Sequence, residues 1–468
     1  MQDLIPGATM FPLNNTIDNT ETQKTAVSAS ANHVDVLRYH PPMSKSFHLS
    51  QKAARTNEQP ITYLMAQAVS NPNMISLAAG LVDYESLPVP ESEKLLGQML
   101  RDPALARIAL QYGTTHGLTE LRQMLLSHLE SLDGVSASQL SATANDIIIT
   151  TGSQQMLFVL TDILIDPGDI VITEWPSYFV YTGLLESAGA IVRGVEMDDQ
   201  GMIPDRLEAV FAKIADEGQL HRVKMVYTCD YHQNPTGLTL SEDRRPRVLD
   251  IVRKWSNDPE SGGRILLLED AAYRELTYEG SVPHSIKKHD STGEYVALLQ
   301  TFSKPFSPGF KTGYGLLPSD LVDPALAQKG NHDFGSNNLS QHLLLAAMKS
   351  GLYHKHVKEL CRVYAIKRDA MLAALKEHLG GYPGASWTQP TGGLYVYLTL
   401  PEHVQTGRHS DLFVRCLKEG VIYVPGGYCY GPDTTRVIPQ NTMRLSFGVS
   451  TVKQIHEGIA RLAKAIKG

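Results

Sequence analysis

The sequence predicts an α/β protein with a large, mostly parallel seven-stranded sheet flanked by helices, followed by a smaller α+β domain. Between about residues 90 and 320, short β-branched runs alternate with longer helical stretches. After about residue 340, long helical stretches precede a few strand-like segments. Continuous apolar strands separated by helices are typical of a parallel sheet that is buried on both faces.

The predicted strands of the large sheet are short apolar runs with turn or helix signals between them. They cover residues 146–150, 170–173, 191–195, 223–227, 264–268, 295–299 and 313–317. The first helix of the alternating region starts at Ser153, and Asp166-Pro-Gly would end it. In open α/β sheets, ligands bind beyond the carboxyl ends of the strands, so functional residues should follow the strands directly.

The C-terminal part has a different pattern. Helical stretches at 342–352 and 356–379 lead to strand-like segments at 392–400, 421–425 and 443–447 and then to a final helix. This order favours a smaller domain with an antiparallel sheet. We therefore expect four parts, which are a flexible polar extension at 1–45, a segment at 46–90 that joins the small domain, a large domain at 91–340 and a small C-terminal domain at 341–468.

The composition argues against several classes of protein. The 468 residues are 42% hydrophobic and 19% charged, which is enough apolar material for two domains with sizeable cores. The net charge of -7 argues against a nucleic-acid binder, and no apolar run approaches the roughly 20 residues that cross a membrane. The four cysteines are scattered without a C-x-x-C pair, which gives no metal signature and favours a cytoplasmic protein.

Lys304 is the first candidate for chemistry. It follows the predicted strand at 295–299, with hydroxyls at Thr301 and Ser303 before it and a Pro-Gly turn after it. An amine in a dry pocket has a lowered pKa and can attack a carbonyl, while hydroxyls and turn amides can hold a phosphate. The segment would therefore suit a phosphorylated aldehyde cofactor, and an ordinary surface lysine is the competing interpretation.

Further candidates follow other predicted strands. Ser153 and Gln154 come after a glycine at a helix start, where free amides favour an anion, although the same sequence is also a good helix cap. Tyr178 would stack on a flat ring or pack in the core. Asn234 belongs to an Asn-Pro-Thr-Gly sequence, which marks a turn. Its side chain would project over the strand ends, and an ordinary turn without a function is the alternative interpretation.

Two charged residues lie in or beside apolar segments, where a buried charge needs an oppositely charged partner. Asp270 follows the apolar run at 264–268, with Tyr273 three residues further on. A buried carboxylate there would pair with a protonated ring nitrogen, and a helix N-cap is the alternative. Arg444 lies inside the segment at 443–447, where a guanidinium is costly unless it is paired. A substrate carboxylate is its natural bidentate partner, and an internal salt bridge is the competing interpretation.

In combination, these motifs resemble the class I/II aminotransferase family, fold type I enzymes that depend on pyridoxal 5'-phosphate. Asn234-Pro-Thr-Gly, Asp270-x-x-Tyr273, the Lys304 segment and Arg444 carry the resemblance, which covers most of the chain. It implies the fold type I architecture and a ping-pong transamination between an L-amino acid and a 2-oxo acid. It also implies a homodimer with shared active sites.

The resemblance implies a role for each matching residue. Lys304 would be the Schiff-base lysine that also carries the proton, Asp270 would keep the pyridine nitrogen protonated, and these two with Tyr178 would be the catalytic residues. The implied cofactor contacts are Ser153 and Gln154 at the phosphate, Tyr178 on the ring, Asn234 and Tyr273 at the phenolic oxygen, Thr301 beside the lysine, and Tyr112 at the phosphate of the neighbouring subunit. Gly80, Asn234 and Arg444 would lie at the substrate carboxylate.

The sequence departs from the family pattern at Lys311, where the family usually has an arginine that grips the phosphate. Lysine keeps the charge but loses the planar fork, so Lys311 would hold the phosphate as a point cation. Val82 and Asp83 replace the usual Leu-Pro after Gly80, so we expect the loop at the substrate entrance to differ.

Two alternatives use the same scaffold. A carbon–sulfur lyase would release ammonia and pyruvate, and a regulatory module would bind the cofactor without turnover. The polar, aperiodic first 45 residues lack a helix-turn-helix, which argues against the regulator. The donor stays open, because no second arginine is placed for a side-chain carboxylate. Tyr63, Tyr84 and Tyr395 would favour aromatic, aliphatic or long-chain donors if they line the pocket.

Overall fold

The large predicted sheet is present in the computed structural model, which describes residues 47–71 and 73–468; the predicted extension at 1–45 lies outside them. Its strands are β2 (Ile147–Thr150), β3 (Ile170–Trp175), β4 (Ile191–Asp198), β5 (Gly201–Met202), β6 (Val223–Thr228), β7 (Leu266–Asp270), β8 (Val296–Thr301) and β9 (Gly313–Leu316). They lie in the order β2-β9-β8-β7-β6-β3-β4-β5. Strands β4, β3, β6, β7 and β8 form a parallel block, while β9 and β5 pair antiparallel to their neighbours.

All seven predicted strands occur, and an eighth, β5, is a two-residue partner of β4. Strand β7 differs from its prediction, because it begins at Leu266 and continues through Glu269 and Asp270. The prediction ended before these carboxylates, since charged residues are rarely buried without partners. Both side chains are buried in the structure, and each accepts hydrogen bonds there.

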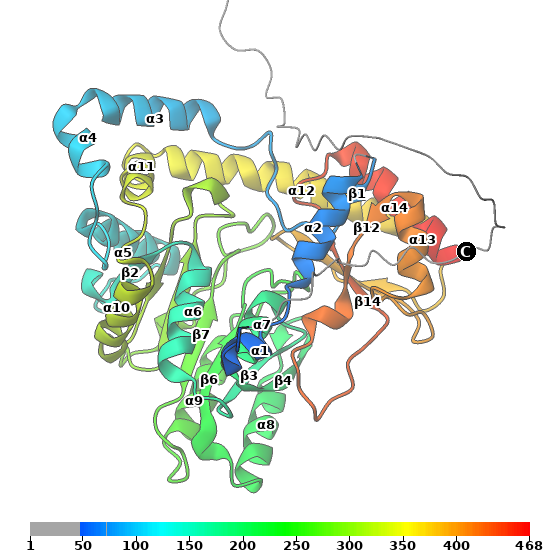
Figure 1. The fold of residues 1–468 in the computed structure, drawn as a ribbon, viewed down its shortest axis with the longest axis horizontal. Helices are drawn as coiled ribbons and strands as arrows, with labels where there is room; N and C mark the ends of the chain where they lie inside the picture. The colour runs from blue at the N-terminus through cyan, green and yellow to red at the C-terminus, as the bar shows by residue number, and fades with distance from the viewer. Residues whose placement is uncertain (1–46, 72) are drawn as a thin grey trace, which may run out of the picture. The chain divides into compact units, whose positions relative to one another are not determined.

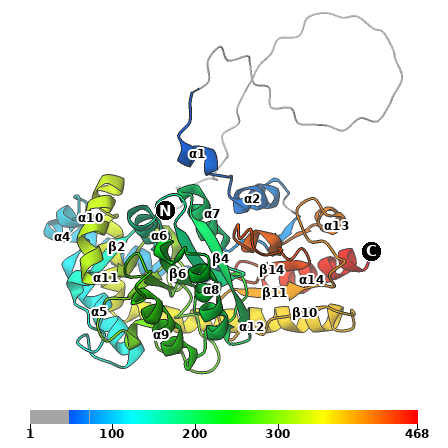
Figure 2. The same ribbon diagram turned by 90° about the horizontal axis from the view of Figure 1, so that it is seen from below.

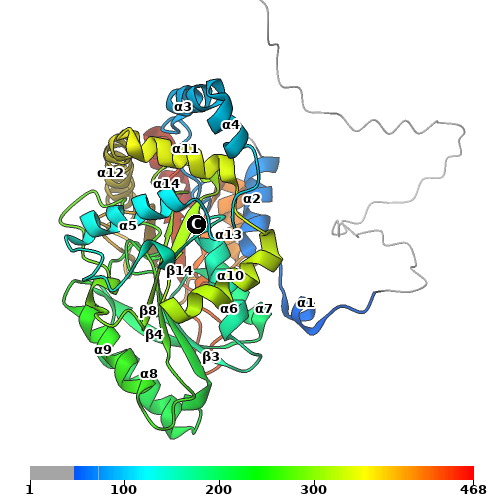
Figure 3. The same ribbon diagram turned by 90° about the vertical axis from the view of Figure 1, so that its left-hand side faces the viewer.

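Helices cover both faces of the sheet, as Figure 3 shows around β3, β4 and β8. One face packs against α6 (Ser153–Leu164), α7 (Phe179–Ala188) and α10 (Ser319–Asp333), and the other against α8 (Pro204–Asp216), α9 (Arg244–Ser256), α5 (Thr119–Asp133) and α11 (Asn338–Lys349). Alternate strand residues point to opposite faces, so Tyr227 joins the core with α6 and α7 while its neighbour Val226 joins the core with α8 and α9. The same alternation decides which strand-end residues share a cavity.

The C-terminal part has the predicted α+β arrangement, with an antiparallel sheet in the order β10-β11-β14-β13. Helix α12 (Leu352–Leu379) extends from α11 to α14 (Val452–Lys467) in Figure 1, and Figure 2 shows β11 and β14 beside α14. The other elements are α1 (Gln51–Arg55), α2 (Pro60–Ser70), β1 (Ile75–Ser76), α3 (Val89–Arg101), α4 (Pro103–Ala109), β10 (Ser386–Trp387), β11 (Tyr395–Thr399), α13 (Asp411–Glu419), β12 (Val421–Ile422), β13 (Val424–Pro425) and β14 (Thr442–Ser446). None of the helices in the described part of the chain has the length and apolarity to cross a bilayer.

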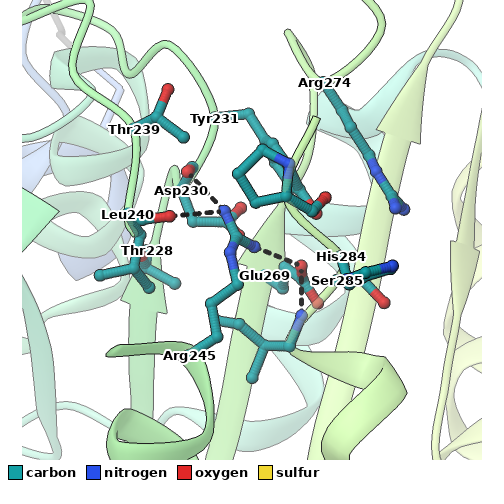
Figure 4. Close-up of polar contacts among 12 residues, drawn as sticks. Thr228, Asp230, Tyr231, Thr239, Leu240, Arg245, Glu269, Arg274, His284 and Ser285 are labelled. Carbon is teal, nitrogen blue, oxygen red and sulfur yellow. Dashed lines mark hydrogen bonds and ion pairs between the residues drawn. The ribbon is translucent and has the colours of Figure 1, made fainter. Parts of the chain in front are cut away.

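A buried charged cluster fixes the loops that follow β6 and β7 (Figure 4). Arg245 of α9 pairs with Asp230, lies 3.6 Å from a carboxylate oxygen of Glu269 and donates to the carbonyl oxygen of Leu240 at 3.0 Å. Burial raises the pKa of both carboxyls, against the pull of the guanidinium. Since Asp230 follows β6 and Glu269 belongs to β7, the cluster holds these strand ends together on the face opposite to Asp270.

Arg245→Ala should cost about 3–5 kcal/mol of unfolding free energy, because it leaves two buried carboxylates without their cation. The matched control is Arg247→Ala on the same helix, since Arg247 pairs with Asp205 where the side chains are 53% and 85% exposed. The control should cost about 1 kcal/mol or less. Shifts in the urea midpoint at unchanged slope measure both losses. Equal losses in the two variants would contradict the role of the cluster.

Candidate active site

A cavity of about 180 Å³ lies beyond the carboxyl ends of the parallel strands. Predicted site residues from five separate strand ends line it, namely Ser153, Gln154, Tyr178, Asn234, Asp270, Tyr273, Thr301, Lys304 and Lys311. Thr151, Gly152, Cys229, Ala272 and Ser303 complete the lining. The sheet therefore brings together side chains that are far apart in the sequence, at the edge where open α/β sheets bind ligands.

Lys304 enters the cavity from the turn that follows β8. Its Nζ donates a hydrogen bond to the Gly80 carbonyl oxygen at 2.8 Å. Burial lowers the pKa of the Lys304 amine, and the positive charges of Arg444 and Lys311 lower it further, against the opposing effect of Tyr395. The surroundings therefore favour a neutral amine, which is the form that attacks carbonyls and accepts protons.

Asp270 is the last residue of β7. One carboxylate oxygen accepts a hydrogen bond from the Tyr227 hydroxyl at 3.0 Å, and the other accepts one from the Ala272 amide at 3.3 Å. Burial raises the pKa of Asp270 to about 6 in spite of these donors. No lysine or arginine pairs with this carboxylate anywhere in residues 47–71 and 73–468. A cation from outside the chain would therefore stabilise its ionised form.

The loop that leads to Asn234 is held by a buried carboxylate on the neighbouring strand. Glu174 of β3 accepts hydrogen bonds from the Thr228 hydroxyl at 2.6 Å, the Cys229 amide at 3.0 Å and the Gln233 side-chain amide at 2.6 Å. Burial raises the pKa of Glu174 to about 7. These bonds tie the loop between β6 and Asn234 to the end of β3 and so place the Asn234 amide in the cavity wall.

The opposite end of the cavity suits an anion. Gly152, at a φ of 73°, turns the chain from β2 into α6 and leaves the first amides of the helix unpaired within the helix. A side chain at Gly313 would lie 2.7 Å from the backbone of Gly152 and Ser153, so only glycine lets β9 approach this turn. Thr301 adds a hydroxyl that donates to Ser303 at 3.1 Å. Amides, hydroxyls and the nearby Lys311 make this the electropositive end of the site.

Arg444 of β14 lies next to the cavity wall. Its guanidinium donates to the Asn234 side-chain oxygen at 2.8 Å and to the Ala78 carbonyl oxygen at 2.6 Å. The Nε–H group is buried and has no partner among the described residues. The rings of Tyr395 and Phe179 flank the guanidinium, with centroids at 4.4 and 5.3 Å. This is a buried, oriented cation with aromatic sides, as a carboxylate-binding arginine requires.

The family model described as aminotransferase class I and II matches residues 72–462. This chain belongs to that family. The match spans all the motifs that carried the resemblance, and the sequence-based prediction of the family is confirmed.

Relatives of known activity cover nearly the whole chain. The aromatic-amino-acid aminotransferase 1 of Thermococcus litoralis is 33% identical over 91% of this chain and 96% of its own length. The 2-aminoadipate transaminase of Thermus thermophilus is 29% identical over 91% of this chain and 98% of its length. The structure of the kynurenine aminotransferase of Pyrococcus horikoshii, 33% identical, covers 90% of this chain and 96% of its own, with a TM-score of 0.80. The predicted fold and transaminase function are thereby confirmed.

The enzyme depends on pyridoxal 5'-phosphate, as its family does, and the chemistry of the cavity fits that group. The buried carboxylate of Asp270 lacks a cation, and a protonated ring nitrogen would supply one. The amine of Lys304 suits the aldehyde, and the turn at Gly152 with Lys311 suits the phosphate. The residues of this aminotransferase therefore offer a complementary group to each polar end of the cofactor.

Tyr112 does not line the cavity. Its side chain is 83% exposed and packs edge-on against Phe334 at a centroid distance of 5.8 Å. Tyr395 places its hydroxyl 3.1 Å from that of Tyr273, which lines the cavity, and its ring lies beside the Arg444 guanidinium. Sequence reasoning missed Tyr227 and Glu174, because each lies in an apolar strand and looks like a packing residue or a strand end.

Asp270→Asn should change how stability depends on pH in the cofactor-free protein. The folded pKa of about 6 lies above the usual value, so the wild-type carboxyl stabilises the fold fully at low pH and this contribution is lost as pH rises toward 6. The unfolding free energy of wild type should fall relative to the variant between pH 4 and 6.5, by on the order of 3 kcal/mol.

Urea unfolding at several pH values measures this difference. The control is Asp250→Asn, the same carboxyl-to-amide change at a side chain that is 72% exposed. A flat difference for Asp270→Asn would contradict the raised pKa.

Proposed function

We propose that this aminotransferase moves the amino group of an aromatic L-amino acid to a 2-oxo acid by a ping-pong mechanism, with Lys304 as covalent anchor and proton carrier. The supporting observation is the convergence of three complementary groups. The amine of Lys304 and the carboxylate of Asp270 line one cavity, and Arg444 donates to Asn234 in its wall.

Lys304 would act as both base and acid. Burial favours its neutral form, and a neutral Nζ can accept the α-proton of the amino acid and later return it. When bound, the cofactor withdraws electrons from the substrate α-carbon and so acidifies its C–H bond. Asp270 would hold the ring nitrogen, Tyr178 would cover one face of the ring, and Arg444 would orient the substrate carboxylate.

Aromatic donors suit the surroundings of Arg444. Phe179 and Tyr395 flank the guanidinium, so the side chain of a bound amino acid would lie near apolar ring surface. Relatives named for aromatic amino acids and kynurenine support the same class. Within the described residues, the cations that line the cavity are Lys304 and Lys311, which are needed for the cofactor.

We also propose a cytoplasmic homodimer in which Tyr112 reaches the cofactor phosphate of the partner subunit. Large apolar side chains are exposed along α3, α4 and the end of α10, namely Leu100, Ile108, Leu110, Tyr112 and Phe334. Tyr112 and Phe334 pack edge to face, and large exposed apolar side chains favour a protein interface. All four cysteines are free thiols, which suits a reducing compartment.

Lys304→Ala tests the central assignment. The variant should carry no cofactor after borohydride reduction, as read by intact mass, because the amine that binds the aldehyde is gone. Amino transfer should fall by about 10²–10⁴-fold, since the proton carrier is lost as well. The control is Lys311→Ala, which should bind cofactor more weakly but keep the covalent attachment. Lys304→Ala protein that retains attached cofactor and normal turnover would refute the assignment.

A panel of amino donors tests the substrate class. Phenylalanine, tyrosine and kynurenine should exceed aspartate by about tenfold or more in kcat/KM, because burying an unpaired second carboxylate costs at least about 1.4 kcal/mol. The measurement is the initial rate of 2-oxo acid formation with each donor, with 2-aminoadipate included as a long-chain acidic donor. Aspartate turnover equal to that of phenylalanine would exclude the proposed class.

A further inference from the structure

Tyr227 is a buried tyrosine whose hydroxyl faces the site without lining its cavity. It lies near the end of β6 and is fully buried. In the pairing of β6 with β7, Tyr227 lies opposite Leu268, and Asp270 is two residues further along β7. Residues two apart on a strand point to the same face, so Tyr227 and Asp270 are diagonal neighbours on the face of α6 and α7.

The contact between them is a hydrogen bond of ordinary length. The Tyr227 hydroxyl donates to one Asp270 oxygen at 3.0 Å, while the Ala272 amide donates to the other at 3.3 Å. Tyr227 is the donor, because burial and the charge of Asp270 raise the pKa of its phenol and keep it protonated. Two donors on different oxygens hold the plane of the carboxylate in one orientation.

The hydroxyl is not needed for packing. Residue 227 is surrounded by apolar groups such as Met225 and Leu268, where phenylalanine would fill the same volume. Among the residues that the structure describes, Tyr227 supplies the one side-chain hydrogen bond that Asp270 accepts. The oxygen atom is therefore the part of this residue that acts on the site.

We infer that Tyr227 is a positioning residue that keeps Asp270 ionised and turned toward the ring nitrogen of the cofactor, an inference that rests on the proposed role of Asp270. A donor to a carboxylate favours its charged form. A proton shared between Asp270 and the ring nitrogen then stays on the nitrogen, where it strengthens the electron-withdrawing ring. Without the hydroxyl, the proton shifts toward Asp270.

Tyr181 provides a matched control in the same core. Its ring centroid lies 4.3 Å from that of Tyr227, and its hydroxyl contacts the Met225 sulfur at 3.1 Å and the Thr161 hydroxyl at 3.5 Å. Like Tyr227 it is fully buried, but no hydrogen bond joins it to Asp270 among the described side chains. Tyr181→Phe therefore removes an equally buried hydroxyl without touching the carboxylate.

The experiment compares two ligands of the full-length apoenzyme, pyridoxal 5'-phosphate and its 1-deaza analogue, in which a C–H group replaces the ring nitrogen. Dissociation constants come from quenching of protein fluorescence. Wild type should bind the cofactor more tightly than the analogue. Tyr227→Phe should reduce that ratio by about tenfold, the effect of one hydrogen bond to a charged group, and Tyr181→Phe should leave it unchanged. In an Asp270→Asn background, Tyr227→Phe should have no effect on the ratio.

Each other outcome counts against the inference. A Tyr227→Phe enzyme that discriminates between the ligands as wild type does overturns it. Equal weakening of both ligands also overturns it, because that pattern marks a structural role. If wild type itself fails to discriminate, the contact of Asp270 with the ring nitrogen is wrong and the inference falls with it. In the loaded enzyme, Tyr227→Phe should lower kcat with little change in the KM for the donor.

Discussion

The two consecutive carboxylates at the end of β7 set the conditions for the site, because strand alternation sends them to opposite faces of the sheet. Glu269 joins the buried cluster around Arg245, where a cation of the chain opposes the effect of burial on the carboxyl. Asp270 faces the cavity, where the chain supplies hydrogen-bond donors but no paired cation within the described residues. The fold thus uses one carboxylate to fix the strand ends and keeps the other available for a cationic ligand.

Two basic side chains, Arg444 and Lys304, lie in or beside the cavity that Asp270 faces, and the first affects the second. Arg444 comes from β14 of the C-terminal sheet, yet it donates to Asn234 beyond β6 and to the backbone of Ala78. It therefore connects three distant segments at the point where a substrate carboxylate would bind. Its charge, together with burial, also lowers the pKa of Lys304. The guanidinium that is proposed to orient the substrate thereby also favours the neutral form of the Lys304 amine.

The sequence predicted most of the strands, because buried parallel strands are continuous apolar runs. Most of the candidate site residues share one cavity because their motifs follow those runs. It could not give the end of β7, where Glu269 and Asp270 stay in the strand through partners distant in the sequence. It also missed Tyr227, since a tyrosine in an apolar strand looks like any core residue until the register with β7 is known. The features that were not predicted are side-chain contacts between neighbouring strands, because no local sequence pattern encodes the register of a sheet.

At Lys311, the surrounding structure changes the role that the sequence motif suggests. Its backbone lies at a φ of 49°, a left-handed conformation that costs a lysine about 1 kcal/mol or more and persists only where the surroundings impose it. The side chain is exposed at the rim, while the amides after Gly152 and the Thr301 hydroxyl lie inside. A lysine there supplies charge without a bidentate fork. In the proposed site, the buried amides and hydroxyls, which the close approach of Gly313 holds in place, would then set the direction of phosphate binding.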